Sequence, residues 1–358
     1  MKLKRLLFIA ITVWLGVGLA GAQKFLYDVD FVLNFDNREI NHSYEPSGTL
    51  FGFRLSPSVG VGLQDSLGGS HRLIAGVSYL QPCGADWKHV KVYPTAYYHY
   101  SRRGFEMHTG FVPYSELRQA LPDYLRSDSL AFAYPNVQGT VFQYHSRHGY
   151  VMALCDWRGL MSRDTREAFR IVGGGRFQHQ WFYTGGYAQM NHLSHNADTI
   201  TGVCDDILFN PLIGANIGQY TPLDSLSVQV GYLGSLQRDR KAGFTYWCHG
   251  MQADVCLVWR FIGFRNILYV GQNQMPLYPQ YGQLLNQGDP RYQAKLYNRT
   301  DLWFYIVRRS FVTCFAGWSL LLTDHGTVSN QQQVVCRFNL DAVLHDRRKT
   351  TIKTLGWR

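Results

Sequence analysis

The stretch FLYDVDFVLNF, residues 25–35, has a large apolar side chain at every odd position from Phe25 to Phe35. Asp28, Asp30 and Asn34 lie between them. Successive side chains of a β-strand point to opposite faces, so this period of two predicts a strand with one apolar face and one mainly polar face.

The same alternation returns along the chain. In residues 49–64 the apolar positions include Phe51, Phe53 and Leu55, and the positions between them are mostly small or polar. A soluble β-sandwich also alternates, but its polar face usually carries more Lys and Glu. Here that face is rich in Ser, Gly, Gln and Asn, which suits a confined aqueous lumen with lipid on the other side.

The alternation divides the chain into sixteen strand-like segments, with fourteen to eighteen left open. They are 25–35, 49–63, 71–80, 89–100, 104–112, 137–145, 149–157, 166–178, 181–190, 207–219, 225–236, 243–257, 260–271, 299–307, 310–322 and 332–344. The fold class predicted is all-β, a transmembrane antiparallel β-barrel.

The connections between these segments also alternate, in length. Tight turns are expected near residues 101–104, 146–149, 179–180 and 308–310, and long linkers at 36–48, 113–136, 191–206 and 272–298. If the first strand runs outward, all these turns are periplasmic and all these long loops are external. Outer-membrane barrels follow this rule.

The composition excludes other classes. The 358 residues are 46% hydrophobic and 17% charged, with 15% aromatic residues and a mean hydropathy of −0.19. These values argue against a helical membrane bundle, a disordered chain and a coiled coil. The net charge of +10 includes no long Lys/Arg run, so no nucleic-acid partner is expected.

The N-terminus has the pattern of a cleaved secretory signal. Lys2, Lys4 and Arg5 precede an apolar run that ends at Ala20-Gly21-Ala22, an A-x-A site. We therefore expect residues 1–22 to be removed and residues 23–358 to form a single barrel domain.

Across this mature region the chain resembles Gram-negative outer-membrane β-barrels of the porin type. The motif NFDNREI (34–40) is similar to uncharacterised porin-like barrels of Bacteroidota. The resemblance implies the bacterial outer membrane as location, with membrane lipid, small polar solutes and the barrel-assembly machinery as partners. It leaves homo-oligomerisation open. The chain departs from porins by ending TIKTLGWR, so 351–358 either completes the closing strand or forms a tail.

The polar positions of the strands supply pore-lining candidates. They are Asp28, Asp30, Arg54, Lys91, His99, Glu106, His108, Arg170, Arg176, Arg337 and Asp341. Basic groups predominate, which favours anions in a pore. The alternative is that opposed Asp and Arg side chains neutralise each other across a packed interior.

Two long linkers could narrow or cover the pore. By resemblance to sixteen-stranded porins, linker 113–136 folds inward as a constriction or else caps the surface. Its charged residues are Glu116, Arg118, Asp123, Arg126 and Asp128. Linker 272–298 is a second candidate, as a lid or a ligand-contact loop.

No catalytic motif, cofactor site or convincing metal site is visible. The weak metal candidates are His192 and His195, in an H-x-x-H spacing that is more often solvated. The seven cysteines show no C-x-x-C pair, and those in strands are expected to act as small apolar residues. Whether Cys83 and Cys204 pair is left open.

The function predicted is a non-enzymatic porin-like channel for passive diffusion of small polar solutes, with a mild anion bias. Two alternatives remain. One is a non-conducting barrel that serves as a surface-binding or secretion-linked scaffold, and the other is a hydrolase of lipid or peptide at the barrel rim.

Overall fold

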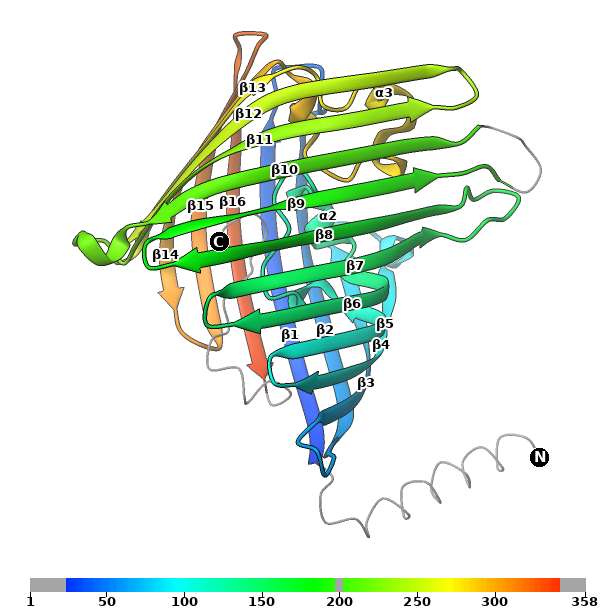
Figure 1. Cartoon of the computed structure of the whole chain (residues 1–358), viewed down its shortest axis with the longest axis vertical. Helices are drawn as coiled ribbons and strands as arrows, with labels where there is room; N and C mark the ends of the chain where they lie inside the picture. Colours follow the sequence, from blue (N-terminus) through cyan, green and yellow to red (C-terminus); the bar gives the residue numbers. More distant parts are fainter. Residues whose placement is uncertain (1–23, 197–201, 342–358) are drawn as a thin grey trace.

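A computed structural model describes residues 24–196 and 202–341. Sixteen antiparallel strands, β1 to β16, pair in sequence order, and β16 pairs with β1 to close the barrel (Figure 1). The predicted all-β barrel of about sixteen strands is confirmed. Within the described part of the chain, no helix has the length and apolar character needed to cross a membrane. The signal peptide and the C-terminal segment 351–358 lie outside the described residues.

The strands are 9 to 17 residues long. Their bounds are β1 Lys24–Glu39, β2 Gly48–Gln64, β3 Ser70–Pro82, β4 Lys91–Arg102, β5 Phe105–Pro113, β6 Asn136–Ser146, β7 Gly149–Gly159, β8 Ala168–His179, β9 Phe182–Leu193, β10 Cys204–Asn216, β11 Ser225–Asp239, β12 Phe244–Trp259, β13 Ile262–Gly271, β14 Leu296–Arg308, β15 Val312–Thr323 and β16 Val328–Asp341. The short helices are η2 Trp87–His89, η3 Tyr114–Glu116, α2 Asp128–Ala133, η4 Gly218–Tyr220, α3 Tyr278–Tyr281, η5 Gly282–Leu284 and η6 Pro290–Gln293.

The two ends of the barrel differ, as the linker lengths predicted. We call the end where β1 begins the turn end, and it carries the tight turns. One of these is the turn at Arg103-Gly104, where both residues have positive φ and join β4 to β5. The opposite end, the loop end, carries the long connections 40–47, 114–135, 194–203 and 272–295.

The faces of the wall invert the usual pattern of a soluble protein. Phe25 and Tyr27 on the outer face of β1 are 67% and 46% exposed, whereas Asn34 and Asp36 on its inner face are 1% exposed. The same arrangement repeats around the wall: large apolar side chains cover the outside, and the inside holds the buried polar side chains together with a buried apolar cluster. An outward apolar band is the signature of a barrel that meets lipid.

Aromatic rings on the inner face lie over glycines of the neighbouring strand. A Cβ added to Gly263 of β13 would lie 1.9 Å from the Trp303 ring of β14. Gly250 lies in the same way under the ring of Tyr269, and Gly214 under that of Tyr183. Each ring therefore occupies the space that the missing side chain leaves.

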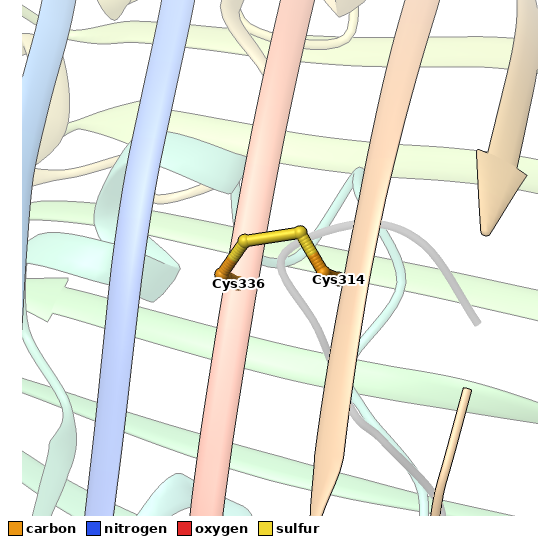
Figure 2. Close-up of a disulfide and its surroundings, with 2 residues drawn as sticks. All are labelled: Cys314 and Cys336. Atoms are coloured by element: carbon orange, nitrogen blue, oxygen red, sulfur yellow. A yellow bond between two sulfur atoms is a disulfide. The ribbon is translucent and has the colours of Figure 1, made fainter. Parts of the chain in front are cut away.

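A disulfide joins β15 to β16, the two last strands. Cys314 and Cys336 are directly opposed in the ladder with their Cα atoms 4.1 Å apart (Figure 2). The expectation that strand cysteines act only as small apolar residues is therefore wrong for this pair, because the register places the two side chains on the same face. Cys83 and Cys204 are both free. Cys204, which falls within the predicted linker 191–206, is instead the buried first residue of β10.

Candidate functional site

Two loop-end connections fold into the barrel. We call residues 114–135 and 272–295 together the plug. The two segments hydrogen-bond to each other, from the Ser127 N–H to the Gln287 carbonyl and from the Asp289 N–H to the Asp123 carbonyl, each at 2.8 Å. Leu117 and Leu125 are 1% and 0% exposed. Of the two alternatives for linker 113–136, the inward fold is the one observed.

The wall holds the plug from several sides. The Arg54 side chain of β2 donates to the carbonyls of Ala131 and Phe132, at 3.3 and 3.1 Å. Tyr124 donates its hydroxyl to Asn210 of β10 at 2.7 Å. Because β2 and β10 lie on different sides of the closed ring, these contacts place the plug inside the lumen (Figure 1).

Buried ion pairs reinforce this attachment. Arg265 of β13 lies 3.0 Å from Asp123 of the plug and 2.8 Å from Asp254 of β12. Arg299 of β14 lies 3.0 Å from Asp128, the first residue of α2. All these groups are at most 8% exposed. The interior thus combines these opposed charges with a cluster of buried apolar side chains that the plug and the wall share, among them Leu117, Leu125 and Leu208.

The remaining plug candidates also reach wall residues or one another. Arg118 forms an ion pair with Glu106 of β5, and Glu116 lies 3.8 Å from His108. The Arg126 guanidinium lies 3.4 Å from the centre of the Tyr114 ring.

The pore-lining candidates lie in different surroundings. Arg170 is fully buried and donates to the Leu125 carbonyl of the plug at 3.0 Å, and Arg337 is 2.6 Å from Asp30. Arg176 covers the Tyr183 ring near the turn end, whereas Lys91 begins β4 at the loop end, 5.7 Å from the Tyr134 ring. The register places Asp341 opposite Asp28.

Three of these candidates, His99, Glu106 and His108, lie together. They come from the β4–β5 hairpin, and their exposed fractions are 5%, 7% and 0%. Their donor atoms lie within 4.8 Å of one another. All three are among the residues predicted to line the lumen, but their convergence was not predicted.

A polar cavity of about 760 Å³ is present near the turn end. Its lining includes Arg147, His148, Arg176 and His179, and it includes no Asp or Glu among the described residues. Gln119 of the plug contributes to the same lining. The cavity therefore offers a basic environment on one side of the plug.

The outer face carries a different polar group at the loop end. His192 of β9 is opposite Asp205 of β10, with Nδ1 2.8 Å from Oδ1, and Asp205 also accepts from Arg240 at 2.9 Å. The Phe169 ring stacks on His192 at 4.9 Å. We call His192 and Asp205 the rim dyad. His195 is instead within 3.1 Å of the Ser194 hydroxyl.

The rim dyad lies on the outer face of the barrel, on the loop-end side of exposed apolar side chains. Two positions toward the turn end, the same outer face carries Ile171 on β8 and Ile207 on β10, which are 43% and 38% exposed. The sequence names His192 as a weak metal candidate, and the carboxylates at 205 and 206 could extend that cluster or be a solvated strand start; the hydrogen-bonded pair of His192 and Asp205 depends on the register of β9 and β10. The signal that could have found the pair is that His192 and Asp205 are polar residues at strand positions whose side chains face outward, where apolar residues are expected.

The architecture is similar to that of solved porin structures. The crystal structure of Pseudomonas aeruginosa OpdL matches with a TM-score of 0.54 and 11% identity, over 88% of this chain and 99% of that chain. A mutant of the Rh. blastica porin matches with a TM-score of 0.50 and 8% identity, over 88% and 100% of the two chains. At such low identity, these similarities establish the porin-like barrel fold, which is typical of bacterial outer membranes.

A family model described as "Lipid A 3'-O-deacylase-type" matches residues 20–315, from before β1 into β15. The chain belongs to the lipid A 3'-O-deacylase-type family. This membership corrects the expectation of a protein that is not an enzyme, because the family is described by an enzymatic activity. No curated protein matches this family member significantly.

Proposed function

We propose that the protein resides in the bacterial outer membrane and hydrolyses an acyl ester of a lipid A-type glycolipid at the loop-end rim. The observation that carries this proposal is the rim dyad, a histidine hydrogen-bonded to a carboxylate at the edge of the outer apolar wall in a member of a deacylase-type family.

The dyad has the arrangement of a general base with its orienting group. A carboxylate that accepts from Nδ1–H fixes the imidazole tautomer and leaves Nε2 to accept a proton. In the proposed reaction, Nε2 of His192 takes a proton from water as the water oxygen attacks the ester carbonyl. The bond between the acyl carbon and the sugar oxygen then breaks, and the departing sugar oxygen takes the proton from Nε2, so the products are a free fatty acid and a sugar hydroxyl.

The surroundings fit an amphiphilic substrate. Acyl chains would lie against the apolar face that includes Ile171 and Ile207, and the anionic head group would lie near Arg240. The Arg240 side chain is 52% exposed and so is accessible to a phosphate from outside the barrel. Arginine suits phosphate because its guanidinium presents paired donors.

The test is hydrolysis by the refolded barrel in detergent. Mass spectrometry of purified lipid A should show the loss of one acyl chain, and His192→Gln should lower the rate by about 10²- to 10⁴-fold. His249→Gln, which changes an exposed histidine on β12, is the matched control and should keep the wild-type rate. Folded wild-type protein that leaves every acyl chain in place would refute the proposed activity, and an unchanged rate in His192→Gln would refute the assignment of the dyad.

The turn-end cavity favours a second candidate function, the passage of small anionic solutes. Its Arg and His lining would attract anions, and passage would require the plug to shift. Conductance of single barrels in a planar bilayer tests this candidate. We expect brief openings that become more frequent when Arg265→Gln weakens the plug, and silent bilayers for both proteins would exclude it.

A further inference from the structure

We infer that His99, His108 and Glu106 bind a divalent transition-metal ion, with Zn²⁺ the best fit, inside the barrel on the β4–β5 hairpin. This site is independent of the proposed hydrolysis, because its ligands point into the lumen and the rim dyad lies on the outer face.

The hairpin brings the three side chains together. His99 and His108 are directly opposed in the antiparallel ladder, and their rings stack with centres 4.2 Å apart and planes 9° apart. Glu106 is two residues from His108 and therefore lies on the same face of β5. Its Oε2 is 3.7 Å from Nε2 of His108. Among the described residues, this is the group of His, Cys, Asp and Glu side chains whose donor atoms converge as a metal site requires.

The histidine nitrogens lack the partners that burial demands. Nε2 of His99 and both ring nitrogens of His108 have no hydrogen-bond partner among the described residues, although His108 is fully buried. A buried polar atom without a hydrogen bond costs about 1–3 kcal/mol. A metal ion removes this cost for the atoms that bind it, because neutral imidazole nitrogen is a preferred zinc ligand.

The donor set has the composition of a three-ligand zinc site. Two imidazoles and one carboxylate are combined in known His₂Glu sites, where the fourth position holds water or another ligand. Only a small contraction of the 3.7 Å separation is needed to bring both atoms to about 2 Å from one ion.

The plug supplies an outer carboxylate. Oε2 of Glu116, in η3, is 3.8 Å from Nδ1 of His108. A carboxylate at this nitrogen fixes the tautomer that presents Nε2 to the metal, so Glu116 is a positioning residue. Since Glu116 belongs to the plug and the ligands belong to the wall, metal binding stabilises the attachment of the plug.

The test is Zn²⁺ binding to the refolded full-length barrel after chelator treatment. Competition with a chromophoric chelator should give one Zn²⁺ per chain, and X-ray absorption should show only nitrogen and oxygen ligands. Loss of an outer-shell partner costs 10- to 100-fold in affinity, so His99→Gln and His108→Gln should each weaken binding by at least about 100-fold. Glu116→Gln should weaken it by about 10- to 100-fold.

His71→Gln is the matched control. His71 lies on β3, one residue from the Arg72 that opposes His99, and it points to the outer face. Its substitution should leave affinity unchanged. His108→Phe keeps a flat ring against His99 and serves as the second variant if His108→Gln does not fold. Wild-type protein without a stoichiometric ion, or folded His99 and His108 variants with wild-type affinity, would overturn the site.

Hydrogen exchange gives a second readout. Zn²⁺ should slow exchange in residues 114–118 of wild-type protein but not of His108→Phe. Equal exchange with and without Zn²⁺ in the wild type would overturn the link between the metal and the plug.

Discussion

Arg265 of β13 and Asp123 of the plug form an ion pair across 142 residues of sequence, with Nη1 3.0 Å from Oδ2 and both side chains at most 6% exposed. The same guanidinium contacts Asp254 on the wall, so one residue connects the plug to two strands. This ion pair is one of the contacts that hold the plug in the lumen, and its contribution can be tested directly.

Arg265→Gln should destabilise the folded barrel by about 3–5 kcal/mol, because it leaves buried carboxylates without their cation. The free energy of unfolding in guanidinium chloride measures the loss. Arg308→Gln is the control, since Arg308 and Asp224 form a pair 3.7 Å apart whose side chains are about half exposed. Such a pair contributes at most about 1 kcal/mol. Equal losses in the two variants would contradict the role of Arg265.

Gly263→Ala should destabilise the wall by about 1–3 kcal/mol, because the added methyl group needs space that the Trp303 ring occupies. The tryptophan fluorescence should change together with the stability as the ring moves. Gly173→Ala is the matched control on β8, where an added Cβ meets no atom within 4 Å. A Gly263→Ala barrel as stable as the Gly173→Ala barrel would disprove the packing argument.

Removing the disulfide should lower stability by about 3 kcal/mol, the value expected for a closed loop of roughly twenty residues. Urea unfolding of the Cys314→Ser, Cys336→Ser double variant measures this loss. Cys83→Ser alters a free cysteine and should leave the unfolding midpoint unchanged. A double variant with the wild-type midpoint would show that the bond contributes nothing to stability.

Acidification should lower the stability of the folded protein through His42, which lies in the loop between β1 and β2. Partial burial, together with the Arg291 guanidinium, holds the pKa of His42 below its usual value. The unfolded chain therefore takes up a proton at a higher pH than the folded protein. The contribution of neutral His42 to the free energy of unfolding is complete above about pH 6.5, and it is lost as the pH falls through the lower pKa of the folded protein.

The melting temperature of wild-type protein and His42→Gln at pH 8 and pH 5 tests this dependence. The wild type should lose more stability than the variant at the lower pH. If both proteins respond equally to pH, another group is responsible.

The strands of the wall were predictable because the alternation of residue types within each strand reflects which face meets the outside and which meets the lumen. The odd apolar positions of β1 meet the outside and its even positions the lumen, as the alternation indicates. The predicted strand boundaries are wrong where this alternation is weak. The last strand was predicted to begin at residue 332, but it begins at Val328. Gln331, Gln332 and Gln333 are all polar, so their sequence does not show that their side chains alternate between the two faces.

The interior was less predictable. Asp128 and Arg299 are 171 residues apart, and nothing near either one indicates the other. His99 and His108 are a different case, because they are nearly equidistant from the tight turn at Arg103-Gly104. A hairpin register drawn around that turn would have paired them.

The covalent link between β15 and β16 also determines how the ring can close. A slip of one residue between paired strands exchanges the two faces of a strand. With Cys314 tied to Cys336, the final hairpin has a single alignment, so Gln331 and Gln333 stay inside and Val334 outside when β16 meets β1. The disulfide thereby excludes the misaligned pairings of β15 and β16 before β16 pairs with β1.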